Sequence, residues 1–306
     1  MSQRRYHKKE VEGLTMQIFI NGAFFSEAEA KISVFDHGFL YGDGIFEGIR
    51  VYNSRIFKLD EHLDRLYDSA KAIMLDIPLS REELTAATLE TCKKSNIYDK
   101  GYIRLVVSRG AGDLGLDIRK CKKASVIIIA STLSLYPTEF YEIGMAIVTV
   151  PTRRNLAESV NPAIKSLNYL NNILAKIEAV NAGVEEAVML NQEGFVAECT
   201  GDNIFIIKNG TLLTPPVYMG VLDGITRQTA MQLARGLNIP VEEKAMTRYD
   251  LYTADECFLT GSAAEIIPVN EIDKRVIGDG KAGALTRKLI ERFREFVKTQ
   301  GTVIPR

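Results

Sequence analysis

The spacing of apolar and polar residues predicts that the chain begins with β-strands and continues with helices. The stretch "QIFINGAFF" places Asn21-Gly22 between two apolar runs, a pattern typical of a β-hairpin with a two-residue turn. "IFEGIRVYNSRIFKL" predicts two more strands that turn at Asn53-Ser54. From Asp60, a residue type suited to an N-cap, apolar residues recur at helical spacing as far as Pro78. The first part of the chain is therefore expected to combine a sheet with helices.

A change of pattern near residue 132 predicts a boundary between two domains. Before it, the capping box Ser80-x-x-Glu83 predicts a second helix, and "YIRLVVS" and "ASVIIIAS" predict two strands. The next stretch, "TLSLYPTEFY", contains a proline and has no period. We interpret residues 132–142 as a linker between a small domain, 17–131, and a large domain, 143–306, with residues 1–16 as a tail.

The second half mixes strands and helices without strict alternation. "GMAIVTV" predicts a strand, and the helix that follows "NPAIKSLNYL" is expected to end at Gly183. Short strands are predicted at "EEAVMLN", "FVAECT", "NIFIIKNGTLL", "ECFLTGS" and "IIPVNEI". Two amphipathic helices are predicted at 226–237 and 282–297. This order indicates mixed α+β and α/β layers.

Composition narrows the class of protein. The chain has 306 residues, 46% of them hydrophobic, which supports sizeable cores. A net charge of −1 argues against a nucleic-acid surface, and the basic run at residues 4–9 is interpreted as part of a tail. No stretch approaches the roughly 20 apolar residues of a membrane span, and no signal-peptide pattern opens the chain. We therefore expect a cytoplasmic protein that binds neither nucleic acid nor a membrane.

The cysteines and histidines do not predict a metal site. Four scattered cysteines lack a CxxC pair and a nearby histidine, which indicates reduced thiols instead of zinc ligands. Only three histidines are present, without an HExxH pattern. We expect no metal.

A glycine-rich stretch at residues 110–115 matches GxGxxG after a predicted strand. A dinucleotide site also needs a helix to open there, so that its N-terminal amides hold the pyrophosphate. Here "LDIRKCKKA" follows, which is charged and aperiodic, and the next predicted element is a strand. We interpret the stretch as a glycine-rich loop that borders a pocket at most, which leaves an NAD-dependent oxidoreductase as a remote alternative.

Lys165 in "NPAIKSLNYL" lies among apolar neighbours, ahead of a helix start and without an acid nearby in sequence. Most lysines are simply solvated, and this reading stays open. Partial burial, however, lowers the pKa of a lysine from about 10.4 toward neutrality. A neutral amine is a nucleophile that can form a Schiff base with an aldehyde.

Three further stretches carry polar groups in apolar surroundings. Glu198 lies in the predicted strand "FVAECT", where it is expected either to form a salt bridge or to sit beneath a heteroaromatic nitrogen. Thr226 follows Gly224 where a helix begins, so the free amides suit a phosphate, although an ordinary N-cap is an equal alternative. The small residues at 261–264 end a predicted strand, where they either pack tightly or let a ligand approach the backbone.

Together these stretches resemble, in order and spacing, the fold-type IV pyridoxal-phosphate enzymes, and most closely the branched-chain amino-acid aminotransferases. The matching segments cover nearly everything after residue 17: "DHGFLYGDGIFEGIRVY", "HLDRLYDSA", "YIRLVVSRGAGDLGLD", "NPAIKSLNYLNNILAKIEA", "EGFVAECTGDNIF", "GVLDGITR" and "LTGSAAEIIPV". The resemblance implies a D-amino-acid aminotransferase-like fold. In this fold a small N-terminal α/β domain precedes a larger, β-barrel-like α/β domain.

The resemblance also implies roles for particular residues. Lys165 would carry pyridoxal phosphate and move the substrate proton, Tyr169 would bind the phenolic oxygen, and Glu198 would bind the pyridine nitrogen. Arg65, which the sequence alone does not distinguish from a solvated charge, falls on the phosphate arginine of the family. The remaining cofactor contacts would come from Leu222, Ile225, Thr226 and Ser262, and the backbone of Ser262 and Ala263 would hold the substrate carboxylate.

The implied reaction moves the amino group of L-leucine, L-isoleucine or L-valine to 2-oxoglutarate in ping-pong fashion. Tyr41, Phe46, Gly48 and Tyr102 would line the apolar pocket, while Arg104, with the Tyr41 hydroxyl, would bind the distal carboxylate of glutamate. For the tyrosines and Arg104 the alternative is ordinary strand packing or a surface ion pair.

Relatives of the same fold include D-amino-acid and (R)-amine transaminases and, more remotely, aminodeoxychorismate lyase. The D-amino-acid enzymes carry Arg-x-His on the loop after the "YIR"-type strand, whereas this chain has Arg109-Gly110-Ala111 there. The absent histidine counts against a D-amino-acid substrate. Family members place their active sites at a subunit interface, so a homo-oligomer, either a dimer or a hexamer of dimers, is expected.

Overall fold

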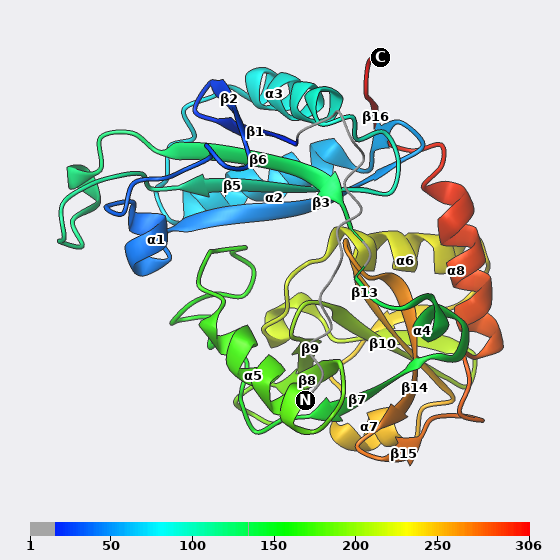
Figure 1. Cartoon of the computed structure of the whole chain (residues 1–306). Helices are drawn as coiled ribbons and strands as arrows, with labels where there is room; N and C mark the ends of the chain where they lie inside the picture. The colour runs from blue at the N-terminus through cyan, green and yellow to red at the C-terminus, as the bar shows by residue number, and fades with distance from the viewer. Residues whose placement is uncertain (1–15, 134) are drawn as a thin grey trace, which may run out of the picture.

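The computed structural model describes residues 16–133 and 135–306, and in these ranges the strands form two sheets (Figure 1). The predicted tail, including its basic run, lies outside the described residues except for Met16. The first sheet has the strand order β16-β4-β3-β5-β6-β1-β2. Its strands are β1 (Gln17–Ile20), β2 (Ala23–Ser26), β3 (Gly44–Tyr52), β4 (Arg55–Ile56), β5 (Gly101–Ser108), β6 (Ser125–Thr132) and β16 (Thr302–Val303).

Helices α2 (Leu59–Ala72) and α3 (Arg81–Lys94) pack against the first sheet and enclose its core. The capping box predicted for α3 is confirmed, because Ser80 accepts from the amide of Glu83, whose carboxylate accepts from the amide of Ser80. The N-cap predicted for α2 is wrong. The N-cap is Lys58, in a left-handed conformation, and Asp60 lies within the first turn, where its charge suits the helix dipole.

Both predicted hairpin turns are present in the first sheet. Asn21 and Gly22 join β1 to β2 with φ of 51° and 96°, and Asn53 and Ser54 join β3 to β4 with φ of 46° and 58°. Two successive residues with positive φ match the twist of the paired strands, which explains why Asn-Gly is favoured there. The glycine-rich stretch is a loop between β5 and β6 with one 3₁₀ turn at Ile118–Lys120. Residues 109–124 are all described and contain no α-helix, so the loop interpretation is confirmed.

The second sheet has the order β12-β11-β10-β13-β14-β7-β8-β9, and β15 pairs with β14. It curls, so that one core lies inside the curve and a second lies under the helices on its outer face. Its strands are β7 (Met145–Thr149), β8 (Glu186–Leu190), β9 (Val196–Cys199), β10 (Asn203–Lys208), β11 (Thr211–Thr214), β12 (Val241–Glu243), β13 (Glu256–Gly261), β14 (Glu265–Ile272) and β15 (Arg275–Val276).

Two helices of the second half, α6 (Ile225–Gly236) and α8 (Ala284–Phe296), form the outer core with β13 and β14. They begin and end within two residues of the predicted helices. Helix α5 (Leu170–Asn181) packs on β8 and ends just before Gly183, as predicted. The short helices α1 (His37–Tyr41), α4 (Thr138–Ile143) and α7 (Arg248–Tyr252) have no predicted counterpart.

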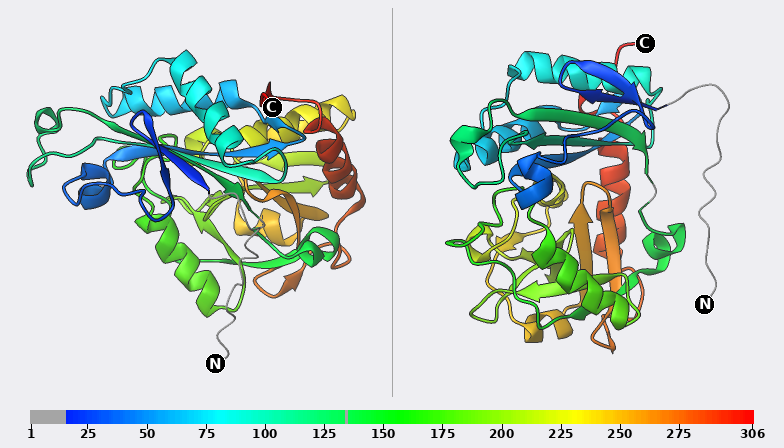
Figure 2. Two further views of the ribbon diagram at one scale, coloured as in Figure 1. Left: turned by 45° about the horizontal axis from the view of Figure 1, so that its top comes forward. Right: turned by 60° about the vertical axis from the view of Figure 1, so that its left-hand side comes forward.

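The two sheets form two bodies connected by β6 and the segment after it (Figures 1 and 2). The segment predicted to be an irregular linker contains α4, which packs on β14. The last strand, β16, returns to pair with β4 in the first sheet, so the final residues do not stay with the second body. We retain 17–131, 132–142 and 143–306 as a proposed division, with β16 as its exception.

A segment of the second half is attached to β3 of the first sheet. The amide of Phe46 donates to the carbonyl of Lys165 at 2.9 Å, and the amide of Leu167 donates to the carbonyl of Gly44 at the same distance. Ile45 and Ser166 form an isolated β-bridge between these two hydrogen bonds. The backbone of Lys165 is thereby fixed between the two bodies.

Within the described residues, no helix has the length and apolar character needed to span a membrane. Residues 16–133 and 135–306 also contain no group of three or more metal-ligating side chains.

Candidate active site

A cavity of about 550 Å³ lies between the two bodies and is lined by strands of both sheets. It brings together thirteen of the fourteen predicted site residues. These are Phe46, Gly48, Arg65, Tyr102, Arg104, Lys165, Tyr169, Glu198, Leu222, Ile225, Thr226, Ser262 and Ala263. Positions from 46 to 263 thus converge on one cleft.

Tyr41 is the exception. It ends α1 on the first body and is exposed, and its hydroxyl donates to the carbonyl of Leu114. Tyr41 therefore does not line the cleft of its own chain, and its predicted contact with a substrate stays a prediction.

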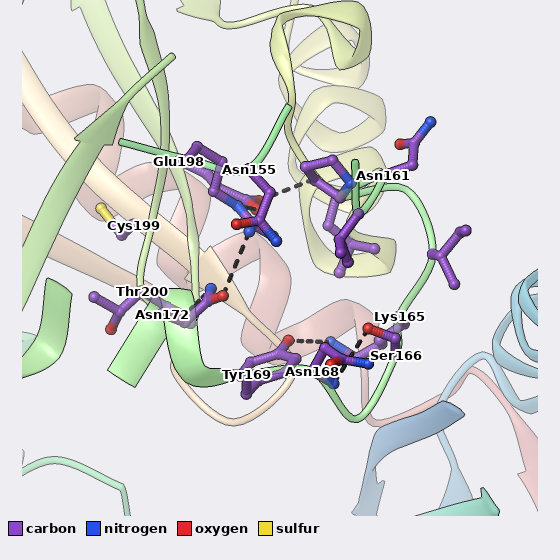
Figure 3. Close-up of a pocket in the computed structure, with 16 residues that line it drawn as sticks. Asn155, Asn161, Lys165, Ser166, Asn168, Tyr169, Asn172, Glu198, Cys199 and Thr200 are labelled. Carbon is purple, nitrogen blue, oxygen red and sulfur yellow. Dashed lines mark hydrogen bonds and ion pairs between the residues drawn. The ribbon is translucent and has the colours of Figure 1, made fainter. Parts of the chain in front are cut away.

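The Lys165 ammonium has no carboxylate partner among the described residues. Its Nζ lies 3.3 Å from the Tyr169 hydroxyl and 4.6 Å from the centre of the Phe46 ring. Its backbone amide donates to Ser69 Oγ at 3.3 Å. Figure 3 shows Lys165 and Tyr169 beside a narrow recess of about 30 Å³ that runs toward Glu198. The side chain is half-buried, and it is held by aromatic rings instead of an ion pair.

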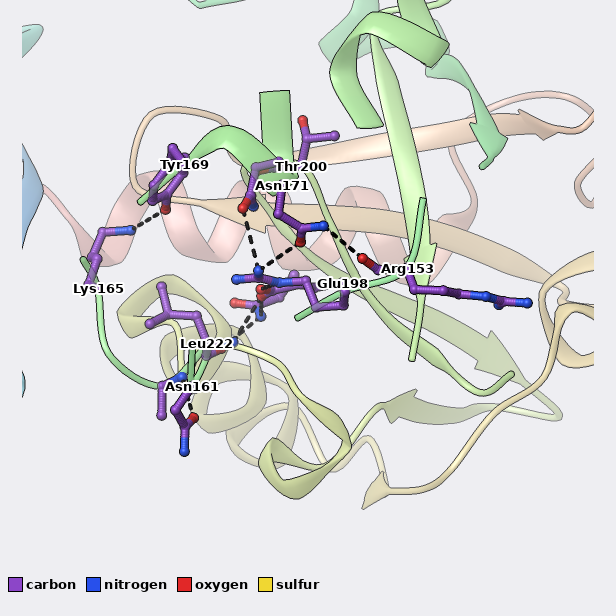
Figure 4. A network of polar contacts seen from close by, with 12 residues as sticks. Arg153, Asn161, Lys165, Tyr169, Asn171, Glu198, Thr200 and Leu222 are labelled. Atoms are coloured by element: carbon purple, nitrogen blue, oxygen red, sulfur yellow. Dashed lines mark hydrogen bonds and ion pairs between the residues drawn. The ribbon is translucent and has the colours of Figure 1, made fainter. Parts of the chain in front are cut away.

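Glu198 on β9 is buried and receives hydrogen bonds on both carboxylate oxygens (Figure 4). Oε1 accepts from Arg154 Nε at 2.8 Å, and Oε2 accepts from the amide of Leu222 at 2.9 Å and from Asn203 Nδ2 at 3.3 Å. Arg154 also donates to Asn172 Oδ1 at 3.4 Å. The salt-bridge alternative for Glu198 therefore holds, and this salt bridge lies in the same cleft as Lys165.

The sequence analysis missed Arg154. It lies after β7 in "VPTRRN", and it is separated from Glu198 by 44 residues. The only local signal is an arginine close to an apolar strand. Arg154 and the Leu222 amide hold the Glu198 carboxylate in the cleft, where it could accept a hydrogen bond from a protonated ring nitrogen.

Arg65 on α2 lies in the cleft because a buried carboxylate holds it. Its Nε and Nη2 donate to the two oxygens of Glu47 at 2.7 and 2.8 Å, and its Nη1 donates to the carbonyl of Asp223 at 2.8 Å. Glu47 is fully buried and also pairs with His62 Nδ1 at 2.7 Å. The ion pair with Glu47 fixes a guanidinium between the first body and the start of α6.

Burial and charge oppose each other at this cluster. Burial raises the pKa of Glu47, but the charges of Arg65 and His62 and their hydrogen bonds outweigh it and lower that pKa to about 2. The pKa of His62 is lowered, chiefly by burial, although Glu47 counteracts this. Glu47 was not singled out from the sequence, where an acid inside the apolar strand "IFEGIRV" was its only signal.

The N-terminus of α6 offers free backbone amides beside Arg65. Its N-cap is Gly224, without a side-chain cap, and Thr226 is buried in the first turn. Thr226 is therefore not the N-cap that was the alternative expectation. A Cβ on Gly224 would lie 2.1 Å from Asn203 Oδ1, so a larger residue would displace the Asn203 side chain, which donates to Glu198 and to the carbonyl of Leu222. Free amides at the positive end of the helix dipole, together with a guanidinium, suit a phosphate.

The turn between β13 and β14 closes the other side of the cleft with small residues. Gly261, Ser262 and Ala263 line the cavity. Thr260 beside them is almost fully buried, and its Oγ1 has no hydrogen-bond partner in the described chain. A buried hydroxyl without a partner is costly, so a ligand that contacts it would be favoured.

Residues of β3 and β5 form another wall of the cavity. The Arg104 guanidinium stacks over the rings of Phe46 and Tyr102, 4.5 and 5.5 Å from their centres, and has no acid partner among the described residues. Gly48 is required here because a Cβ would lie 2.1 Å from the Tyr102 hydroxyl. Burial raises the pKa of Tyr102, which therefore stays a hydrogen-bond donor.

These features fit pyridoxal phosphate. The cleft holds a lysine without an ion pair to any described residue, a buried carboxylate that could accept from the ring nitrogen, and a guanidinium and helix N-terminus, Arg65 and α6, that suit a phosphate. The unpartnered hydroxyl of Thr260 leaves a hydrogen bond to be made. An apolar pocket with one free guanidinium adjoins them.

Residues 44–272 match the family model described as amino-transferase class IV. A Methanocaldococcus jannaschii protein, provisionally named as a branched-chain-amino-acid aminotransferase, is 55% identical over 280 residues, which are 92% of this chain and 96% of that protein. The Pseudomonas aeruginosa branched-chain-amino-acid aminotransferase is 38% identical over 92% of both chains.

Solved structures give the same result. A branched-chain amino acid aminotransferase from the organism abbreviated "T.th." matches, in complex with pyridoxamine 5'-phosphate, with a TM-score of 0.89 and 39% identity, over 93% of this chain and 94% of that one. The Thermoproteus uzoniensis branched-chain aminotransferase with norvaline matches with a TM-score of 0.88 and 40% identity, over 93% and 96%. Two further structures of the "T.th." enzyme, each 38% identical, contain N-(5'-phosphopyridoxyl)-L-glutamate or 4-methylvaleric acid.

Proposed function

The chain belongs to the class IV aminotransferases, and we propose that it moves the amino group of L-leucine, L-isoleucine or L-valine to 2-oxoglutarate with pyridoxal phosphate as cofactor. One observation carries the proposal. The side-chain amine of Lys165, which has no carboxylate partner among the described residues, faces the same cleft as the Glu198–Arg154 pair and the phosphate-binding groups proposed at the start of α6. Relatives at 35–55% identity carry the branched-chain aminotransferase name.

When bound, pyridoxal phosphate supplies an aldehyde that captures the substrate amine and a ring that accepts the negative charge developing at Cα. Lys165 has two tasks in this proposal: its Nζ would hold the cofactor at rest, and it would then take the proton from the substrate Cα and deliver it to the cofactor carbon that had carried the aldehyde. The Tyr169 hydroxyl, 3.3 Å from Nζ, orients the amine. Glu198, held in place by Arg154, would accept a hydrogen bond from the ring nitrogen.

We assign the cofactor phosphate and the substrate α-carboxylate to different walls of the cleft. Arg65, Thr226 and the first amides of α6 would hold the phosphate, and the aliphatic side chains of Leu222 and Ile225 would contact the ring. The amides of Ser262 and Ala263, at the turn after β13, would hold the substrate α-carboxylate. Separate anion sites fix the direction in which a substrate enters.

Side-chain specificity requires one pocket to accept leucine and glutamate in turn. Phe46 and Tyr102 provide apolar area, with Gly48 leaving room for Tyr102. Arg104, which has no acid partner among the described residues, would provide a donor for a distal carboxylate. The "T.th." relative has been solved with a phosphopyridoxyl-glutamate and with 4-methylvaleric acid, which supports both uses of the pocket.

A D-amino-acid substrate is disfavoured by the state of Arg109. Its guanidinium pairs with both oxygens of Asp43 at 2.9 Å and donates to the carbonyls of Ile73 and Met74, and it does not line the cleft. These hydrogen bonds occupy the Arg109 guanidinium, which is therefore not available to a substrate carboxylate.

We also propose a homodimer as the basic unit. Helix α5 exposes an apolar stripe at positions Leu170, Ile173, Leu174, Ile177 and Val180, each between 48% and 67% exposed. Such a contiguous apolar stripe suits a second copy of the chain. Tyr41, which lies outside its own cleft, would then serve the cleft of the partner. A hexamer of dimers is the alternative that light scattering would distinguish.

The four cysteines of the chain are free, and three of them are buried, which supports a reducing compartment. We therefore propose a cytoplasmic location.

The proposed function is tested with the purified, cofactor-loaded protein. L-Leucine alone should convert the bound cofactor to pyridoxamine phosphate in a single turnover, and adding 2-oxoglutarate should restore it and yield L-glutamate. A cofactor spectrum that L-leucine leaves unchanged would contradict the proposal. Repeated turnover without a 2-oxo acid would instead indicate a lyase.

A further inference from the structure

Asp202 is a buried carboxylate in the cleft wall that accepts no hydrogen bond from the described residues. It lies in the turn between β9 and β10, is 6% exposed and lines the cavity. Its carbonyl accepts from the amide of Cys199 at 2.8 Å, which closes the turn, but its side chain has no donor in the described part of the chain. By contrast, nearby Glu186 accepts from Thr200 and from the amide of Ala187. Because Asp202 lines the cavity, its carboxylate is open to a hydrogen bond with a group bound there.

The side chain of Asp202 contacts the turn proposed to hold the substrate carboxylate. A Cβ built on Gly261 would lie 1.9 Å from Asp202 Oδ1, so the carboxylate packs directly on the glycine. The next residue, Ser262, lines the same cavity. A substrate carboxylate bound at this turn would thus lie near a second carboxylate in a largely desolvated place, and two such groups resist ionising together.

Charged and titratable groups face Asp202 from each neighbouring element. Burial, followed by the charges of Glu186 and Glu198, raises the pKa of Asp202 to about 8, while Lys176 and Lys165 oppose this. Tyr136, Tyr141 and Cys199 also interact with it and are held protonated by raised pKa values of their own. The negative charges outweigh the two lysines.

We propose that Asp202 is a further substrate-binding residue, which carries a proton when the α-carboxylate lies at the Ser262–Ala263 turn and donates that proton in a hydrogen bond to it. This inference rests on the proposed function. Loss of the proton at alkaline pH removes the donor and adds a negative charge beside the substrate carboxylate. Substrates that carry a carboxylate should then bind more weakly, while uncharged analogues should not.

The test measures binding of 4-methylvalerate, a branched carboxylate without an amine, to the cofactor-loaded protein by calorimetry between about pH 6.5 and 9.5. We expect Kd to be about tenfold higher at pH 9 than at pH 7, as linkage to one group of pKa about 8 requires. Asp202→Asn should abolish this difference. Asp76→Asn, at an exposed position of the first body, is the matched control and should follow the wild type.

A second measurement needs no variant. Calorimetry in buffers of different ionisation enthalpy should show uptake of about one proton per 4-methylvalerate bound at pH 9 and almost none at pH 6.5. The uncharged 4-methylpentanamide should take up none at either pH. Absence of proton uptake at pH 9, or a wild-type pH profile in Asp202→Asn, would overturn the inference. L-Leucine turnover measured on the same preparation reports separately whether the proposed function holds.

Discussion

Glu47→Gln tests whether a buried ion pair sets both the stability of the first body and the position of Arg65. The substitution keeps the shape but removes the charge that receives two hydrogen bonds from Arg65 and one from His62. Arg65 is then left 13% exposed without its partner. Removing one member of a buried pair costs about 3–5 kcal/mol. The lowering of the Glu47 pKa from 4.5 to about 2 independently corresponds to about 3 kcal/mol.

The sign of the pH dependence follows from this lowered pKa. Glu47 stabilises the fold fully above the unfolded value of 4.5, and this contribution is lost as the pH falls toward about 2. The free energy of unfolding of the wild type should therefore exceed that of Glu47→Gln by about 3 kcal/mol at pH 7, and by about 1 kcal/mol less at pH 3.5.

Urea unfolding at one protein concentration measures both differences. Glu90→Gln is the control, because Glu90 forms an exposed i,i+4 pair with Lys94 on α3 and should cost no more than about 0.5 kcal/mol. The variant Glu47→Gln should also bind pyridoxal phosphate more weakly, since nothing else orients the Arg65 guanidinium as firmly. A Glu47→Gln protein within about 1 kcal/mol of the wild type at pH 7 would refute the reasoning.

Three further substitutions test other parts of the cleft. Arg154→Met leaves buried Glu198 without its ion pair and should lower the free energy of unfolding in urea by about 3 kcal/mol; no loss would mean that the pair is not formed. Gly48→Ala places a Cβ 2.1 Å from the Tyr102 hydroxyl and should raise the KM for L-leucine by about tenfold or more, with circular dichroism unchanged. Arg104→Gln should raise the KM for 2-oxoglutarate by about 10- to 100-fold while that for L-leucine changes less than about twofold, and an equal change in both would contradict its role.

The sequence predicted those turns and helix starts that depend on residues close together in the chain. The Asn21-Gly22 and Asn53-Ser54 turns depend on left-handed backbone at adjacent residues, and the Ser80–Glu83 capping box on side chains three positions apart. These signals lie within a few residues of one another. The start of α2 was misplaced because Lys58, an unexpected N-cap, adopts a left-handed conformation that no local preference indicates.

The features that could not be predicted from the sequence depend on contacts between residues far apart in the chain. Arg65 and Glu47 are 18 residues apart, on a helix and a strand, and neither has an unusual local environment until α2 packs on β3. Arg154 likewise meets Glu198 only after the second sheet has formed. β16 returns to the first sheet after most of the chain has intervened. The resemblance, in contrast, directed attention to thirteen residues that do share one cleft, and to Tyr41, which does not.

The most direct test of the whole account is to locate the lysine that binds the cofactor. Borohydride reduction of the yellow, cofactor-loaded protein fixes a lysine-bound pyridoxyl group permanently, and peptide mapping by mass spectrometry then identifies its position. We expect the label on Lys165 alone, in the peptide that contains the segment hydrogen-bonded to β3. A label on any other lysine, or a protein that takes up pyridoxal phosphate without labelling, would contradict it.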